Sequence, residues 1–260
     1  ADNNLYRSVN NRWLSLAFYD LLAPFVPQLA QLEAQSPTII VAPAQVLRAL
    51  ALEVLAGTLT LTVKKVISVA EVLEDHDRAL LRQAFGEVGE IYQATEGFLA
   101  STCVCGMLHL NEEFIHVEPE WLDEHRFVPI ITDFTRRTQP VVRYRLDDVL
   151  VASKEPCPCG SATRAIARIE GRQADPCSRV LAITLPPGAD YRLVQTAADT
   201  LCLTADCEPA VLEACQLALN AFFARQGIDV QRLKWQLVSQ RPEVQFGAKR
   251  RRIIRQWREA

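Results

Sequence analysis

Two closely spaced cysteine pairs and a nearby histidine give this sequence its clearest metal-binding pattern. One residue separates Cys103 from Cys105, one residue separates Cys157 from Cys159, and His109 follows the first pair. A tetrahedral zinc ion takes four thiolate or imidazole ligands, which two such clusters can supply. We therefore expect a zinc site built from Cys157, Cys159, His109 and either Cys103 or Cys105. Four protein ligands would close the coordination shell and make the zinc structural rather than catalytic. Alternatively, these residues are free cysteines buried in strands.

The segment from Tyr92 to Gly97, Tyr-Gln-Ala-Thr-Glu-Gly, carries a different set of chemical groups at the end of a predicted parallel strand. Ligands of open α/β sheets bind beyond the carboxyl ends of the strands. The Tyr92 ring could stack on a base, the Thr95 hydroxyl could bond a phosphate, and the Glu96 carboxylate could hold a hard cation. Taken alone, the segment also fits an ordinary polar turn.

Strand and helix patterns alternate in the first part of the chain and must position the Tyr92 segment. Strands are predicted at residues 38–41, 61–69 and 90–94, and helices at residues 45–56 and 75–85. The apolar spacing between residues 11 and 35 predicts two further helices that meet at Pro24 and Pro27. This alternation with short connections is typical of a parallel sheet covered by helices, so the predicted fold class is α/β.

The later part of the chain shows two other patterns. Residues 107–117, 127–132 and 141–151 alternate as in an antiparallel sheet or small barrel. After Gly171-Arg172, the sequence predicts strands at 180–185, 193–203 and 233–240 and a long helix at 208–225. We therefore predict a large domain over residues 1–172 and a small α+β domain over residues 173–260.

Three motifs occur in an order that resembles one enzyme superfamily. They are the 92–97 segment, Arg-Tyr-Arg-Leu-Asp-Asp at residues 143–148, and Ile-Glu-Gly-Arg-Gln-Ala-Asp at residues 169–175. Their order and spacing are similar to those of the adenylate-forming superfamily of acyl- and aryl-CoA ligases, luciferases and peptide-synthetase adenylation domains. Val-Ile-Ser-Val-Ala-Glu at residues 66–71 looks like the strand before the nucleotide motif, and Gly-Ala-Lys at residues 247–249 looks like the motif of the mobile lid.

Within this superfamily, the chain resembles the phenylacetate-CoA-ligase-like branch associated with aromatic and phenazine-type biosynthesis. The supporting stretches are residues 108–112, 140–144 and 157–160. Related proteins carry a comparable Cys, Gly-x-His and Cys-x-Cys-Gly arrangement that looks like a structural zinc site. The resemblance implies part of the large adenylation domain, with a parallel sheet, helices and antiparallel strands, followed by a small C-terminal lid.

The resemblance also implies roles in binding ATP, and then AMP, with magnesium. Tyr92 would stack on adenine, Thr95 would contact the α-phosphate, Glu96 would help hold Mg²⁺, Asp148 would accept the ribose hydroxyls, Arg172 would lie near the ribose at the joint between the domains, and Lys249 would reach the carboxylate and α-phosphate. Attack of a carboxylate on the α-phosphate builds negative charge, which a cation and a lysine stabilise, and no protein nucleophile is required. Alternatively, Lys249 belongs to a solvated basic run that continues through Arg252.

The expected substrate is a carboxylic acid, with CoA or another molecule as the acceptor. The acyl pocket is expected to include Ser68, Ala70, Gln93 and Phe98, whose mostly small and apolar character fits an aromatic acid. The chain departs from the family pattern at two places. Gln93 replaces the usual glycine beside Tyr92, which would narrow the adenine slot, and Ala174 stands where a hinge aspartate is usual.

Composition limits the partners of the protein. Its 260 residues carry 28 Lys and Arg against 31 Asp and Glu, a net charge of −3, so nothing in the bulk charge favours nucleic acid or anionic membrane. No apolar run is long enough for a membrane helix, and we expect a cytoplasmic protein. The family's Ser/Thr/Gly-rich phosphate loop has no counterpart between Ala1 and Tyr92. We therefore expect a downstream fragment that is incomplete for turnover and is joined in its fold by a missing N-terminal segment.

Two other functions remain open from the sequence. The chain could be a non-catalytic, zinc-stabilised remnant of the fold that acts as a binding or regulatory protein. Less favoured is a zinc-stabilised domain that binds nucleic acid through its C-terminal arginines.

Overall fold

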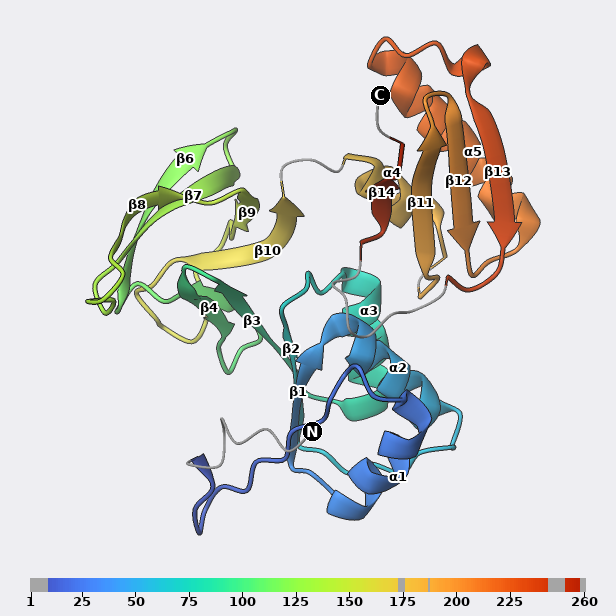
Figure 1. Ribbon diagram of the computed structural model, residues 1–260. Helices are drawn as coiled ribbons and strands as arrows, with labels where there is room; N and C mark the ends of the chain where they lie inside the picture. Colours follow the sequence, from blue (N-terminus) through green and yellow to red (C-terminus); the bar gives the residue numbers. More distant parts are fainter. Residues whose placement is uncertain (1–8, 173–175, 187, 243–250, 258–260) are drawn as a thin grey trace.

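The computed structural model describes residues 9–172, 176–186, 188–242 and 251–257 (Figure 1). Within these ranges, the buried apolar side chains gather in three clusters. The first cluster lies under the N-terminal helices, the second among the antiparallel strands, and the third between the C-terminal strands and helices. Among the described residues, no helix has both the length and the apolar character needed to span a bilayer.

A parallel layer forms the N-terminal part, as the alternating pattern predicts. Its strands are β1 (Ile39–Pro43), β2 (Lys65–Val69) and β3 (Val88–Ala94), and both of their pairings are parallel. Its helices are α1 (Phe25–Gln35), α2 (Ala44–Leu55) and α3 (Asp75–Phe85), which lie on one side of the strands (Figure 1). Leu47, Leu50 and Leu81 are almost fully buried between the two layers, and this burial stabilises the arrangement.

The predicted pair of N-terminal helices is wrong in its first member. Only α1 is helical, and the described residues before Pro24 form turns and irregular chain. The Asn11 side chain accepts hydrogen bonds from the backbone N–H groups of Trp13 and Leu14, at 2.8 and 3.1 Å. Such local bonds by an asparagine compete with a helix. Trp13 is 84% exposed, and of this segment Tyr19 and Leu21 pack against the first cluster without a helix.

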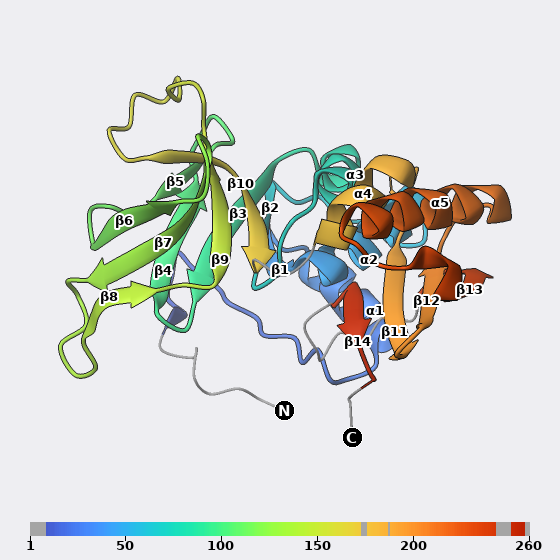
Figure 2. The same ribbon diagram turned by 90° about the horizontal axis from the view of Figure 1, so that it is seen from above.

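An antiparallel sheet continues from β3, which therefore joins two kinds of pairing (Figure 2). It contains β4 (Gly97–Thr102), β5 (Leu108–Leu110), β6 (Ile115–Trp121), β7 (Arg126–Asp133), β8 (Val141–Arg145), β9 (Asp148–Ala152) and β10 (Ala165–Arg172). Within the described ranges, the ten strands form one sheet in the order β1-β2-β3-β4-β5-β10-β9-β7-β6, with β8 beside β7. Alternate side chains such as Ile115, Val117 and Ile131 fill its core, as the period of two requires.

The C-terminal part is a separate four-stranded sheet in the order β13-β12-β11-β14. Its elements are α4 (Pro176–Thr184), β11 (Tyr191–Ala197), β12 (Thr200–Ala205), α5 (Pro209–Arg225), a 3₁₀ turn at Val230–Arg232, β13 (Lys234–Ser239) and β14 (Ile253–Arg255). Helices α4 and α5 share a buried core with the sheet. The α+β character agrees with the prediction.

Two predicted strands of this part are wrong. Residues 180–185 belong largely to helix α4, where Leu181 and Leu185, four residues apart, both enter the core. Residues 193–203 form a hairpin rather than one strand, with a tight turn between β11 and β12 in which the Thr200 hydroxyl donates to Asp199 at 3.0 Å. Short apolar runs do not by themselves distinguish a buried helix from a strand.

Candidate nucleotide site and metal centre

The β3–β4 hairpin carries the residues of the predicted nucleotide motif at its tip. Strand β3 ends at Ala94, Thr95 and Glu96 form the turn, and β4 begins at Gly97. Thr95 is exposed and Glu96 is half-buried. The carbonyl of Thr95 accepts a hydrogen bond from Arg136 Nη2 at 2.7 Å. Arg136 is a contact that the sequence did not predict, because nothing in its local sequence places it beside this turn.

Tyr92 and Asp148 meet across the sheet although 56 residues separate them. The Tyr92 hydroxyl donates to Asp148 Oδ2 at 2.8 Å. The Tyr92 side chain is buried, and burial together with the Asp148 charge raises the pKa of its hydroxyl. Asp148 in turn is the backbone partner of Arg172 in the β9–β10 pairing. Asp148 and Arg172 thus lie on the neighbouring strands β9 and β10, and the fold brings Tyr92 of β3 to Asp148 although β4, β5 and β10 stand between their strands in the sheet order.

Tyr144 is a second residue that the sequence analysis did not single out as a ligand contact. Its side chain is 49% exposed, and the charge of Glu96 and a hydrogen bond to that carboxylate raise the pKa of its hydroxyl. The preceding residue, Arg143, has a positive φ of 47°, which non-glycine residues rarely adopt. Its guanidinium makes a two-pronged contact with Glu118 at 3.0 Å on each arm. Tyr144 thus links β8 to the turn that carries Glu96, and Arg143 links β8 to β6.

The four residues expected in an acyl pocket lie in two places. Gln93 and Phe98 are exposed register partners across the β3–β4 hairpin. Ser68 is fully buried on the face of β2 that also carries Val66, and its Oγ has no hydrogen-bond partner among the described residues. Ala70 follows β2 with a positive φ of 65° and is exposed. A surface cavity of about 430 Å³ lies in the C-terminal part and contains none of these residues in its lining.

Two residues named in the sequence predictions, Lys249 and Ala174, lie outside the described residues. Of Arg172, the structure describes the backbone but not the side chain.

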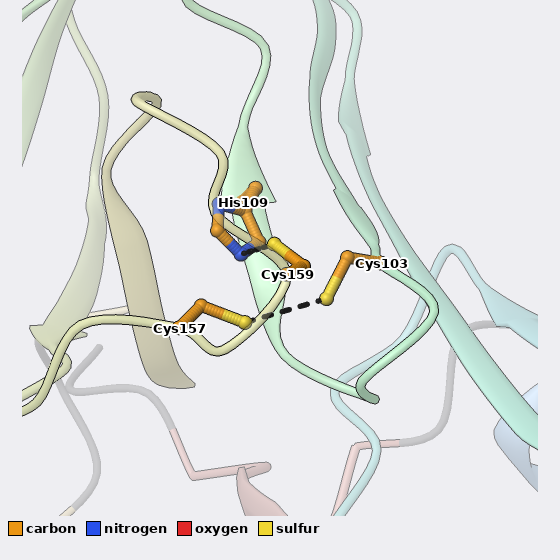
Figure 3. Close-up of side chains that lie close together, drawn as sticks. All are labelled: Cys103, His109, Cys157 and Cys159. Carbon is orange, nitrogen blue, oxygen red and sulfur yellow. Dashed lines mark hydrogen bonds between the residues drawn. The ribbon is translucent and has the colours of Figure 1, made fainter.

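The metal-binding prediction concerns residues that the fold brings together from three segments (Figure 3). One ligand atom from each of Cys103, His109, Cys157 and Cys159 lies within 4.8 Å of the others. The Cys103 and Cys157 sulfurs are 3.6 Å apart, and the Cys159 sulfur is 3.5 Å from His109 Nε2. A tetrahedron with Zn–S bonds of about 2.3 Å and a Zn–N bond of about 2.0 Å has S–S edges of about 3.8 Å and S–N edges of about 3.5 Å. The donor set and its spacing therefore fit zinc.

Matching turns present the cysteines. Gly106 donates its N–H to the Cys103 carbonyl at 3.0 Å, and Gly160 donates to the Cys157 carbonyl at 3.2 Å. Both glycines have positive φ, 80° and 75°, which their lack of a Cβ allows. Cys105 is exposed and stands outside the cluster, although its backbone N–H donates to the Cys103 sulfur at 3.3 Å.

The orientation of His109 and the ionisation of Cys103 suit the cluster to a metal. The His109 Nδ1 lies 3.1 Å from the Thr163 carbonyl, which holds the proton on Nδ1 and leaves Nε2 free as a ligand. Burial opposes ionisation of the Cys103 thiol, but hydrogen bonds from its surroundings outweigh burial and lower its pKa to about 7. For its partner Cys157, a backbone hydrogen bond from Cys159 favours ionisation, but burial, the neighbouring thiols and the Cys103 charge outweigh it and raise the pKa to about 11. Deprotonated thiolates are the form that binds metal.

Comparisons with known proteins support the fold through solved structures. No protein-family model matches the chain, and no curated protein sequence matches it. It superposes on 2-hydroxyisobutyryl-CoA ligase in the postadenylation state with a TM-score of 0.65 and 19% identity, covering 88% of this chain and 56% of that one. The anthranilate CoA ligase AuaEII in complex with anthranoyl-AMP gives a TM-score of 0.54 at 12% identity, covering 86% of this chain and 50% of that one. Amide bond synthetase McbA from Marinactinospora thermotolerans gives a TM-score of 0.53 at 13% identity, covering 86% of this chain and 52% of that one.

These matches establish the fold of adenylate-forming enzymes over most of the chain. The chain spans just over half the length of the structures it matches. For the same 2-hydroxyisobutyryl-CoA ligase, the TM-score is 0.54 with the open conformation and 0.53 with the thioesterification state.

Proposed function

We propose that this protein takes part in ATP-dependent activation of a carboxylic acid as an acyl-adenylate. The observation that carries the proposal is the grouping of Asp148 with Tyr92 and Glu96 of one hairpin of an adenylate-forming fold, although Asp148 is 56 residues from Tyr92 in the sequence. Ligands bind beyond the carboxyl ends of parallel strands in such sheets, which is where β3 ends.

Some of the proposed contacts bind the nucleotide, and others bind the groups that react. Thr95 would contact the α-phosphate, Glu96 with its partner Tyr144 would hold Mg²⁺, and Asp148 would accept the ribose hydroxyls. A bound magnesium ion would supply charge stabilisation at the α-phosphate. Arg172 near the ribose and Lys249 at the reacting carboxylate remain proposals from the sequence motifs. The ring of Tyr92 would stack on adenine. Its hydroxyl, bonded to Asp148, would also hold that carboxylate in place for the ribose.

The proposed substrate is an aromatic acid, and CoA is the proposed acceptor. One structural neighbour is an anthranilate CoA ligase and another binds CoA with an aliphatic acyl-adenylate, so the neighbours do not restrict the acid by themselves. The exposed Phe98 ring beside Gln93 at the hairpin offers an apolar surface for a flat substrate.

A structural zinc ion is proposed at Cys103, His109, Cys157 and Cys159. It would join the turn after β4, strand β5 and the loop after β9, all in the antiparallel sheet. The site lies on segments other than the β3–β4 turn, so its proposed contribution is to stability rather than to the reaction.

A further polypeptide segment is proposed to cover the open side of the parallel layer. Parallel sheets are normally covered on both faces, yet Ile39 and Val41 of the outermost strand β1 are 51% and 56% exposed. The proposal assigns this segment to the same protein. We expect amide exchange at residues 39–43 to be slower in the complete gene product than in residues 1–260 alone; equal exchange would argue against this covering.

ATP–pyrophosphate exchange tests the proposed activity. The complete gene product should exchange label in the presence of an acid from an aromatic and aliphatic panel. Asp148→Asn and Glu96→Gln should each lower exchange at least tenfold, about 1.4 kcal/mol or more of transition-state stabilisation. Glu87→Gln, which alters an exposed carboxylate on the other end of β3, is the matched control and should exchange normally. Nucleotide binding without exchange for any acid would favour the non-catalytic alternative.

A further inference from the structure

The loop after β7 contacts the turn that carries Thr95 and Glu96. Arg136, in this loop, donates from Nη2 to the carbonyl oxygen of Thr95 at 2.7 Å, although 41 residues separate the two in the sequence. That carbonyl belongs to the peptide bond between Thr95 and Glu96, and a peptide bond is planar. A hydrogen bond to its oxygen therefore restrains the plane that ends at the Cα of Glu96, and with it the direction of the Glu96 side chain.

Asp133, the last residue of β7, holds Arg136 in this position. Its Oδ2 lies 3.6 Å from Arg136 Nε, and its Oδ1 accepts from the backbone N–H and the hydroxyl of Thr135 at 2.7 and 2.6 Å. The backbone of Asp133 is paired on both sides, with Ile115 of β6 and Val141 of β8. The position of the guanidinium thus follows the position of the sheet.

Asp133 also lies against the turn itself. Gly97 follows Glu96, and a Cβ added to Gly97 would lie 3.4 Å from Asp133 Oδ2. Hydrogen bonds, above all from the Thr135 hydroxyl, outweigh burial and lower the pKa of the Asp133 carboxyl, so this group is charged at neutral pH. Its side chain is only 6% exposed. Arg136 therefore supplies the cation for a nearly buried charge where the loop meets the turn.

Tyr144 holds the same turn from a second strand. Its hydroxyl makes a hydrogen bond with the Glu96 carboxylate. Tyr144 belongs to β8 and is the register partner of Ile131 in β7. Glu96 is thus restrained at two points, at its preceding peptide plane by Arg136 and at its carboxylate by Tyr144. Both restraints come from the antiparallel sheet and not from the β3–β4 hairpin.

We propose that Arg136, held by Asp133, is a positioning residue that directs the Glu96 carboxylate toward a magnesium ion bound with ATP. This inference rests on the proposed function. Glu96 is half-buried and offers the oxygen ligands that magnesium takes. A hydrogen bond from a charged donor favours one arrangement by about tenfold or more. Apparent affinity falls with the fraction of molecules that hold the competent arrangement, so loss of this bond should weaken the magnesium-dependent part of ATP binding about tenfold.

Substitution of Arg136 in the complete gene product tests the positioning role. Arg136→Met removes the donor, and Arg136→Lys keeps a cation beside Asp133 without the fork that reaches both partners. Arg137→Met is the matched control, because Arg137 is the next residue and is exposed. Thermal unfolding checks that each variant is folded. Amide exchange of residues 94–98 without ligand measures how firmly the turn is held. Calorimetry measures ATP affinity with magnesium and with excess chelator, and the ratio of the two gives the gain from magnesium.

The expected results separate positioning from a general loss of structure. Arg136→Met should speed amide exchange at residues 94–98 and lower the gain from magnesium about tenfold, while ATP affinity in chelator changes less than twofold. Arg136→Lys should lie in between, and Arg137→Met should match the wild type. In Glu96→Gln, which already lacks the carboxylate, the added Arg136→Met should lower the gain no further.

Other results would overturn the positioning role. These are unchanged amide exchange in the turn, additive effects of Arg136→Met and Glu96→Gln, and equal loss of ATP affinity with and without magnesium. The last result would indicate direct contact between Arg136 and a phosphate. If the expected binding results are found but the wild type exchanges no pyrophosphate with any acid, the proposed function is wrong and Arg136 remains a positioning residue of a nucleotide site.

Discussion

Removal of one cysteine from the metal cluster gives the most direct test of the site, and the structure sets the size of the effect. A metal bound by Cys103 and Cys157 closes a loop of 54 residues. Cross-linking a loop of that length removes roughly 14 cal/mol/K of entropy from the unfolded chain, about 4 kcal/mol at room temperature. Cys157→Ser should therefore lower the free energy of unfolding by up to about 4 kcal/mol and the melting temperature by roughly 10 °C.

Three measurements check this expectation. Metal analysis of protein purified under reducing conditions should find about one zinc per chain. Cys157→Ser should lose most of that zinc, and a chelator should lower the melting temperature of the wild type but change that of the variant much less. A thiol reagent should modify more cysteines after chelation, because metal-bound thiolates are protected.

Cys105→Ser is the matched control for this experiment. Cys105 lies on the same turn as Cys103 but is exposed and outside the cluster. The control should keep its zinc and its melting temperature. Equal zinc loss in both variants would refute the reasoning. So would wild-type protein that contains no zinc and whose melting temperature does not change with the chelator, and this result would favour free cysteines.

Three further predictions concern residues around the candidate nucleotide site and the sheet. Arg78→Ala should cost about 3–5 kcal/mol of stability, because it leaves the carboxylate of Glu90, 2.6 Å from Arg78 and 3% exposed, buried without its cation. Burial already raises the pKa of Glu90, so protonation stabilises the folded variant; urea titrations should show a smaller loss near pH 4 than at pH 8. Gly171→Ala should lower the free energy of unfolding by about 1–2 kcal/mol, because the φ of Gly171 is +78° and an added Cβ would lie 3.3 Å from Val72 Cγ2. Since Gly171 precedes Arg172, the substitution should also weaken AMP binding, which calorimetry measures. For Asp123, hydrogen bonds from the His125 and Arg126 backbone and from the Arg126 side chain lower the carboxyl pKa to about 2. Nuclear magnetic resonance titration should find this midpoint. The loss of unfolding free energy in Asp123→Asn should be constant above pH 4 and disappear as the pH falls toward 2.

Much of the fold follows from local sequence patterns. The helix predicted at residues 75–85 is present with those bounds, and the order of strands and helices up to β3 agrees with the pattern. These elements show their period over several turns, so neighbouring residues alone contain the signal. The failures occur where the signal is short or where it is contradicted by local bonds, as in residues 11–23 and 180–185.

The candidate site shows the same division. The residue types at positions 92, 95, 96 and 148 indicate nucleotide chemistry from the sequence alone, but the partners Tyr144 and Arg136 come from β8 and from the chain after β7. Those partners have no local signal, because their position depends on the pairing of strands that lie far apart in the chain.

The sequence by itself determined the fold class, the order of most elements and the residue types able to bind nucleotide and metal, since these depend on composition and on short-range periodicity. Only the tertiary structure chose Cys103 over Cys105 and joined Arg136 to Thr95. Both choices depend on strand register and burial, which sum many distant contacts. A change of one residue in register would turn a side chain to the other face of its strand, and no local pattern contains that information.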